Sequence, residues 1–136
     1  MKVTLKRIAL VCIVLFTTAS LFAVVVDKIS AWSSGGDIIV KLWTSDETGV
    51  QGFVVLRRAG TEGDFQQIGV ISQLKGNNSS YEYVDESVFK ASAGIYQYRI
   101  RIMNGQTPAP ETDIVTVSHV SSTARRTWGS IKAMFR

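Results

Sequence analysis

The run from Tyr96 to Ile102 alternates strictly between apolar and polar side chains, and this alternation constrains the fold more than any other feature of the chain. Successive side chains of a β-strand point to opposite faces, so a period of two residues is typical of a strand buried on one face. The apolar set is Tyr96, Tyr98, Ile100 and Ile102, and the polar set is Gln97, Arg99 and Arg101. The run therefore predicts a half-buried strand in a sheet with one solvated face.

Similar short runs, rich in aromatic and β-branched residues, recur between residues 24 and 120 with turn clusters between them. No segment with helical periodicity separates the runs, which argues against a parallel α/β fold. Residues 24–120 are therefore predicted to be all-β, as a sandwich of two antiparallel sheets with about seven strands. The expected strands are Val24–Trp32, Ile38–Trp43, Phe53–Arg58, Phe65–Ser72, Tyr81–Val84, Ile95–Met103 and Thr112–Val120, and Asn104-Gly105 signals a hairpin after the sixth.

The second of these runs leaves the direction of one tryptophan open. Ile38, Val40 and Leu42 fall on one face of the strand, whereas Trp43 falls on the opposite face. Either the strand is buried on both faces, or a β-bulge before Trp43 resets the alternation. We expect the bulge, which turns this tryptophan inward. The expected core then contains Trp43, Phe53, Val55, Tyr96, Tyr98, Ile100 and Val117.

The N-terminal segment has the three regions of a secretory signal peptide. They are the basic residues Lys2, Lys6 and Arg7, the unbroken apolar run Ile8–Phe16, and small or apolar residues that lead to Ala23. We expect residues 1–23 to be a signal peptide cleaved after Ala23, with Ala19 as the second choice. Export then places the protein in the periplasm, at the cell surface or outside the cell. An uncleaved anchor is the rival interpretation, because apolar residues continue to Val26 and roughly 20 residues span a bilayer.

Composition excludes several classes of protein. The only cysteine is Cys12, inside the apolar run, so the chain beyond it can form no disulfide and no thiolate metal site. The formal net charge of +4 comes from the two ends of the chain, because residues 24–120 hold 8 basic and 11 acidic residues, a net charge of −3. A nucleic-acid-binding domain shows the opposite balance, so we expect no nucleic-acid partner.

No set of residues predicts catalysis, a cofactor or a metal ion. His119 is the only histidine, and it lies in phase with the apolar residues of the last expected strand, as a packed histidine would. The carboxylate pairs Asp46/Glu47 and Asp85/Glu86 each lie in a turn, where solvation and capping are the ordinary roles. No phosphate-binding loop, dinucleotide motif or nucleophile elbow occurs. The chain is therefore predicted not to be an enzyme.

Three arginines could form a basic stripe on one sheet face. Arg57, Arg99 and Arg101 belong to the expected third and sixth strands, which would be neighbours. Such a stripe could bind an anionic glycan. The simpler expectation is a solvated face in which the arginines pair with Glu82 or Asp64, each pair contributing roughly 0–1 kcal/mol.

The C-terminal segment, residues 121–136, leaves the two-residue period and is called the tail below. On a helix, Trp128, Ile131 and Phe135 share one face, and Arg125, Arg126 and Lys132 lie largely elsewhere. A segment this short is marginal alone in water, so it should order only when its apolar face is covered. The tail could dock on its own sandwich, in a groove of a partner or on an anionic membrane surface. We expect it to attach the protein to a partner.

Several stretches together carry a family resemblance. They are Lys41-Leu42-Trp43-Thr44 leading to Glu47, Gly52–Arg57, Phe65 with Ile68-Gly69, Tyr81–Asp85 and Tyr96–Ile100. Over residues 38–120 their order resembles a fibronectin type III domain, an immunoglobulin-like sandwich, in the form common in exported bacterial proteins. The resemblance implies that Trp43 packs the core and that Tyr96 makes the corner hydrogen bond of the sixth strand. Trp43 lies four residues before Glu47, where related sequences often have five, which is a departure in local register. The resemblance implies a binding, spacer or adhesion module.

Two functions follow as hypotheses. The first is a non-catalytic secreted or cell-surface module that binds a protein or a glycan, with the tail as its attachment segment. The alternative is a structural component of a bacterial envelope or export assembly, anchored by the N-terminal apolar segment or by the tail. The first predicts an exposed aromatic or charged patch on the sandwich. The second predicts that removing the tail or the anchor abolishes localisation while the domain still folds. Both are compatible with membrane contact through the tail or an uncleaved N-terminus.

Overall fold

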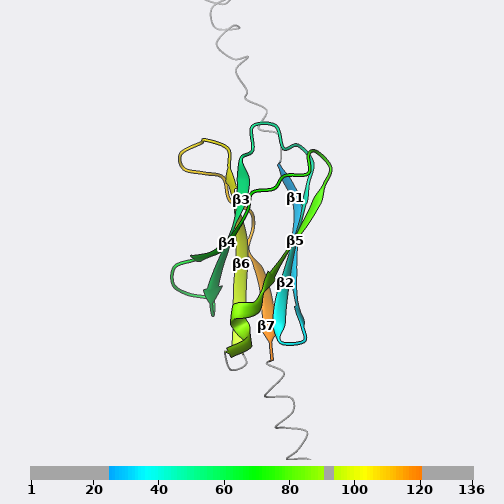
Figure 1. Ribbon diagram of the computed structural model, residues 1–136. Coiled ribbons are helices and arrows are strands. Elements are labelled where there is room, and N and C mark those ends of the chain that lie inside the picture. The colour runs from blue at the N-terminus through cyan, green and yellow to red at the C-terminus, as the bar shows by residue number, and fades with distance from the viewer. Residues whose placement is uncertain (1–24, 91–93, 121–136) are drawn as a thin grey trace, which may run out of the picture.

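The computed structural model describes residues 25–90 and 94–120, and the regular secondary structure of this part of the chain is β-strand apart from one short 3-10 turn (Figure 1). Seven strands and one short 3-10 turn follow one another along it. They are β1 (Val26–Ser34), β2 (Asp37–Thr44), β3 (Gly52–Ala59), β4 (Gln66–Ile71), β5 (Ser80–Asp85), η1 (Glu86–Lys90), β6 (Gly94–Met103) and β7 (Val115–His119).

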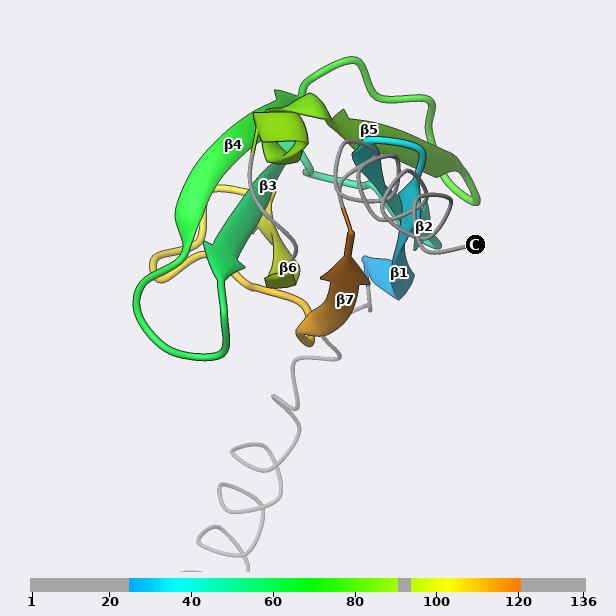
Figure 2. The ribbon, with the colours of Figure 1, turned by 90° about the horizontal axis from the view of Figure 1, so that it is seen from below.

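The strands form two antiparallel sheets that face each other. Sheet A has the order β1-β2-β5, and sheet B has the order β4-β3-β6-β7. Figure 2, seen from below, shows the two sheets as separate layers. The predicted all-β sandwich of seven antiparallel strands is therefore confirmed.

Period-2 alternation places the core between the sheets. In β2, Ile38, Val40 and Leu42 are buried while the residues between them are half-buried. In β6 the predicted alternation holds along the whole strand. Six of the seven residues expected in the core lie in one buried cluster, namely Phe53, Val55, Tyr96, Tyr98, Ile100 and Val117.

The seventh expected core residue, Trp43, lies outside the core, so that prediction is wrong. The strand β2 has no bulge, and its alternation continues through Trp43 to the buried Thr44. The register shift lies instead in the partner strand β1, where Asp27 is the extra residue between the pairs Val26–Thr44 and Lys28–Trp43. The indole of Trp43 therefore projects from the outer face of sheet A.

The connection after Asn104-Gly105 is long, and the last strand begins three residues later than the expected Thr112. Gly105 has φ of 80°, as a tight turn requires, but β7 begins only at Val115. Between them, Ile102 N donates to Pro110 O at 2.8 Å and Thr112 N donates to Ile100 O at 2.9 Å. The C-terminal half of β6 is thus hydrogen-bonded to an irregular segment and not to a strand. The strand β7 has 5 residues, whereas β6 has 10.

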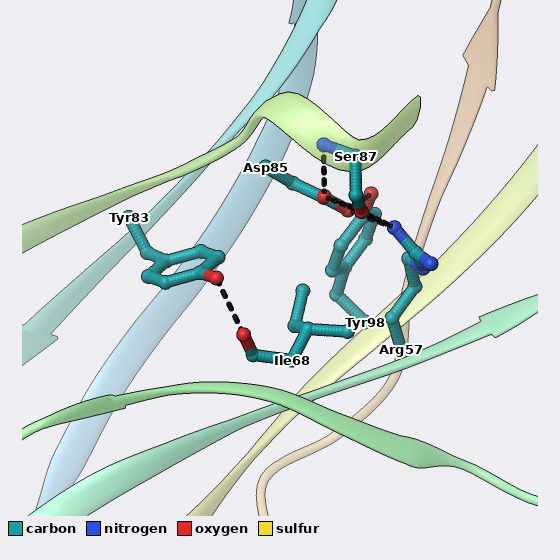
Figure 3. Close-up of polar contacts among 6 residues, drawn as sticks. All are labelled: Arg57, Ile68, Tyr83, Asp85, Ser87 and Tyr98. Carbon is teal, nitrogen blue, oxygen red and sulfur yellow. Dashed lines mark hydrogen bonds and ion pairs between the residues drawn. The ribbon is translucent and has the colours of Figure 1, made fainter. Parts of the chain in front are cut away.

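Two contacts close the two open sides of the sandwich. On one side the Tyr83 hydroxyl of β5 donates to the Ile68 carbonyl of β4 at 2.7 Å (Figure 3). On the other side Ser33 Oγ of β1 lies 2.8 Å from His119 Nδ1 of β7. Ser33 is the next-to-last residue of β1 and His119 is the last residue of β7, so this contact joins the C-terminal ends of the two strands.

Gly69 makes the first closure possible, because the Tyr83 ring lies directly against its backbone. A Cβ at Gly69 would lie 2.2 Å from Tyr83 Cε2, far inside contact distance. We expect Gly69→Ala to lower the free energy of unfolding by about 1–3 kcal/mol, measured by chemical denaturation. In a Tyr83→Leu background the same substitution should cost clearly less. An equal cost in both backgrounds would show that the ring is not the cause.

Candidate functional site

The carboxylate of Asp85 lies at the centre of a polar network that joins the two sheets (Figure 3). Asp85 ends β5 in sheet A and is almost fully buried. From sheet B, Arg57 Nη1 donates to its Oδ2 at 2.7 Å and the Tyr98 hydroxyl donates to the same oxygen at 2.8 Å. The backbone N–H and the hydroxyl of Ser87 donate to its Oδ1. Each oxygen of the carboxylate therefore accepts two hydrogen bonds.

These contacts set the charge state of Asp85. Burial by itself raises the pKa of the Asp85 carboxyl, but hydrogen bonds from Ser87, Arg57 and Tyr98 outweigh it and hold the pKa below its ordinary value of 3.8. Burial and the hydrogen bond to Asp85 raise the pKa of Tyr98. At neutral pH the group is a carboxylate paired with a guanidinium and a phenol, which is an arrangement for stability rather than for proton transfer.

The second buried carboxylate, Glu47, fastens the β4–β5 loop to the turn after β2. Its Oε1 accepts hydrogen bonds from Thr44 Oγ1 and from the Tyr81 hydroxyl, both at 2.7 Å. Its Oε2 accepts the Gly76 N–H at 3.0 Å, and its own N–H donates to Asn77 Oδ1 at 2.7 Å. Glu47 is thus a structural residue, while its neighbour Asp46 accepts the Thr48 N–H as turn carboxylates do.

His119 is packed, as the pattern of the last strand predicted. It is fully buried, its ring lies edge-on to Tyr96 with centroids 6.3 Å apart, and its Nδ1 contacts Ser33. Its Nε2 has no hydrogen-bond partner within the described residues. Among those residues no group of three or more histidine, cysteine or acidic side chains could hold a metal ion.

The arginine stripe differs from the prediction in its members and in its partners. Arg57 lies on the inward face of β3 and forms an ion pair with Asp85. Arg99 and Arg101 do lie on the outer face of sheet B, but both pair with Glu111, at 2.9 Å each. Glu82, which was expected to pair with them, instead pairs with Lys41 at 3.0 Å.

An arginine that the prediction omitted completes the outer face of sheet B. The guanidinium carbons of Arg58 and Arg99 lie 4.6 and 4.2 Å from the centre of the Phe65 ring. Both distances fit cation–π contacts. Arg58 also donates to Gln97 and to the Gly63 carbonyl. The cations of this face are therefore engaged with the protein itself.

The outer face of sheet A carries an exposed apolar row. Trp32 of β1, Ile39 of β2 and Val84 of β5 are direct neighbours in the strand register, so their side chains project from one face. Trp32 is 40% exposed and Val84 is 46% exposed, although both belong to regular strands. We call these three residues the apolar row.

Trp43 lies on the same face, four residues further along β2 than Ile39. The ammonium groups of Lys28 and Lys41 lie 5.0 and 5.3 Å from the centre of its indole ring. These cation–π contacts hold the indole against the sheet. The face thus combines aromatic and aliphatic surface with two cations.

A groove of about 910 Å³ opens on the side of the sandwich between β1 and the segment that precedes β7. Its apolar lining includes Val26, Ile29, Ile102 and Val115. On β1 it is lined by Val26 to Ile29, whereas Ser33, which contacts His119, lies near the other end of that strand.

The residues predicted to attach the protein lie outside the described part of the chain. They are Arg125, Arg126, Trp128, Ile131, Lys132 and Phe135, together with the expected cleavage site at Ala23. The attachment role of the tail and the signal peptide stay predictions. Within residues 25–90 and 94–120, no helix is long and apolar enough to cross a membrane.

Two features of the surface were missed from the sequence, and only one had left a signal. The alternation of β1 puts Trp32 in phase with Ser30 and Lys28, on the polar face of an expected edge strand, and this misplaced tryptophan could have been noticed. The groove had no such signal, because it depends on where β7 begins.

No family model matches the chain, and no curated protein matches it. Among solved structures, a family 76 glycoside hydrolase from a bovine Bacteroides thetaiotaomicron strain is similar at 15% sequence identity, with a TM-score of 0.49. The match covers 70% of this chain and 20% of that chain, so this chain spans about a fifth of that enzyme. A likeness at this level carries no inference about activity.

Proposed function

We propose that the protein is a non-catalytic, exported interaction module that binds a partner protein at the cell envelope through the apolar row. The observation that carries the proposal is the exposure of Trp32 and Val84 side by side with Ile39 across three strands of a regular sheet. Large apolar side chains that gather on one face, rather than scatter singly, are typical of an interaction surface. Tryptophan in particular is enriched among the residues that dominate binding energy.

A protein is favoured over a glycan because of the kinds of side chain in the row. Sugar rings stack on the flat faces of aromatic residues, and two of the three members of the row are aliphatic. A mixed aliphatic and aromatic strip with charged neighbours, here Lys41 and Glu82, resembles the apolar centre and polar rim of a protein–protein interface.

We also propose that the protein is not an enzyme, and the contacts of its buried carboxylates support this part of the proposal. The carboxylates of Asp85 and Glu47 accept hydrogen bonds from their neighbours, and Asp85 is in addition paired with Arg57. The two-sheet architecture supports the resemblance to fibronectin type III domains, which serve as binding and spacing modules. The tail remains the proposed attachment segment, and anchoring within an envelope assembly remains the alternative role.

The proposal is tested by placing charges on the apolar row. Trp32→Lys with Val84→Lys should weaken binding to an envelope partner at least about tenfold, because lysine at the centre of an interface must be desolvated. Partners are captured from envelope fractions with the full chain, identified by mass spectrometry, purified and titrated by calorimetry. The melting temperature should change little, since both side chains are on the surface.

Val70→Lys is the matched control. Val70 is an equally exposed apolar residue, 51% exposed, on the outer face of sheet B. The control should bind like the parent, and equal binding by all three proteins would refute the role of the apolar row. Retention of the parent on polysaccharide gels, lost in the double variant, would assign the row to a glycan. In the same capture experiment, Trp128→Ala with Phe135→Ala should release the partner if the tail takes part.

A further inference from the structure

The groove lies between the edge of sheet A and the segment that leads into β7. On one side lies β1, which pairs with β2 along one edge only, because it is the last strand of sheet A. On the other side lies the irregular segment from Pro110 to Val115. The outer edge of β1 therefore presents backbone N–H and C=O groups that no strand of the described chain pairs with, and such an edge can accept a further strand.

The bulge in β1 shapes the floor of the groove. Because Asp27 is an extra residue, Val26 and Ile29 both pack toward the core although they are three residues apart. Val115 packs from the opposite side, and all three are only partly buried. The floor is thus apolar and still accessible, which suits the inward side chains of a bound strand.

The rim of the groove is negatively charged. Asp27 and Asp113 are exposed and have no ion-pair partner within the described residues. Hydrogen bonds from Thr48 hold the pKa of Asp46 below its ordinary value, so this third carboxylate is also ionised at neutral pH. Glu111 lines the groove as well, but Arg99 and Arg101 neutralise it.

The single lysine of the groove does not cancel this charge. Lys28 points to the outer face of sheet A, where its ammonium group lies over the Trp43 ring. The groove is therefore negatively charged, which complements a cationic peptide. Side chains of a strand alternate between two faces, so a segment of alternating apolar and basic residues could meet the floor with one set and the rim with the other.

We propose that this groove binds an extended polypeptide segment of alternating basic and apolar residues, which adds as a strand to the free edge of β1. The site is separate from the apolar row on the outer face of sheet A and does not depend on that row having a partner. Backbone hydrogen bonds to β1 would supply affinity, and the carboxylates of Asp27, Asp46 and Asp113 would select cationic side chains.

The test uses the full chain and a synthetic heptapeptide of alternating lysine and valine with blocked ends. A peptide of alternating glutamate and valine has the same apolar content and the opposite charge. The lysine peptide should bind, the glutamate peptide should not, and binding should weaken as salt is added. Hydrogen exchange should show new protection at Val26–Ile29. Equal binding of both peptides, or protection only elsewhere, would overturn the proposal.

Substitution of the rim separates the groove from general charge attraction. Asp27→Asn with Asp113→Asn should weaken binding of the lysine peptide about tenfold, because two charge-assisted contacts lose their charge. Glu62→Gln with Asp64→Asn removes the same charge from the exposed β3–β4 loop and should leave the affinity unchanged. If both double variants weaken binding equally, net charge is responsible and the groove is not the site.

The chain's own tail is the competing occupant. Replacing Arg125, Arg126, Lys132 and Arg136 by glutamine should leave the affinity for the lysine peptide unchanged if the groove is open to an external segment. A gain in affinity would mean that the basic tail already fills the groove, and the proposed external ligand would then be wrong.

Discussion

Asp85→Ala is expected to lower the free energy of unfolding by about 3 kcal/mol, because it leaves the Arg57 guanidinium and the Tyr98 hydroxyl without their shared acceptor. This value lies at the lower end of the range for a broken buried ion pair, since the Arg57 side chain keeps 24% exposure and can be partly hydrated. Urea denaturation of the full chain measures the loss.

Glu82→Ala is the matched control on the same strand. Glu82 is 52% exposed and pairs with Lys41, so its removal should cost less than about 1 kcal/mol. A second comparison replaces both charges at once: Arg57→Met with Asp85→Leu should be closer in stability to the parent than Asp85→Ala. If Asp85→Ala and Glu82→Ala cost the same, the network does not hold the sheets together.

The same network predicts a loss of stability in acid. The pKa of Asp85 is lower in the folded protein than its ordinary value of 3.8, so the unfolded chain binds a proton more readily. The contribution of Asp85 to stability is therefore complete above that ordinary value and is lost as the pH falls through the lower folded value. Denaturation between pH 5 and pH 2 should show a steeper loss for the parent than for Asp85→Ala.

Leu42→Ala is expected to cost about 2–5 kcal/mol, whereas Trp43→Ala should cost no more than about 1 kcal/mol. The two residues are consecutive on β2, yet Leu42 is fully buried between the sheets and Trp43 lies on the outer face under Lys28 and Lys41. Thermal and chemical unfolding of the two variants compare the two faces directly. A larger loss for Trp43→Ala would mean that β2 has the opposite orientation to the one described.

This comparison also separates stability from binding on the outer face of sheet A. Because Trp43→Ala should leave the core intact, any effect on partner capture would come from the surface itself. Trp43 would then extend the apolar row along β2.

Much of the fold could be predicted because strand signals are local. In β6 each residue's neighbours two positions away already define which face is apolar, and the structure buries that face. In β3 the apolar run Phe53–Leu56 is buried on both faces, so its pattern did not distinguish them. His119 followed from the same rule, since it continues the inward set of β7. The two-layer architecture follows from short strand-like runs that recur along the chain with turn clusters between them.

The polar networks could be predicted only in part. The turn carboxylate Asp46 caps its own turn, which needs nothing beyond nearby residues. The partners of Asp85 and Glu47 are different in kind, because Arg57 is 28 residues from Asp85 and Tyr81 is 34 residues from Glu47 along the chain. An arginine in a run of alternating residues gives no sign of whether it will meet water or a buried carboxylate.

The sequence by itself determined that the described part of the chain is all-β, which runs become strands and which residues of strands such as β6 face inward, since a period of two is a property of each strand alone. Only the tertiary structure decided the direction of Trp43, the pairing of Arg57 and the opening of the groove. The direction of Trp43 depends on which strand carries the bulge, and the extra residue lies in β1 and not in β2. The groove depends on the late start of β7 opposite a longer β6. Register and strand length are properties of pairs of strands, so the pattern of one strand cannot contain them.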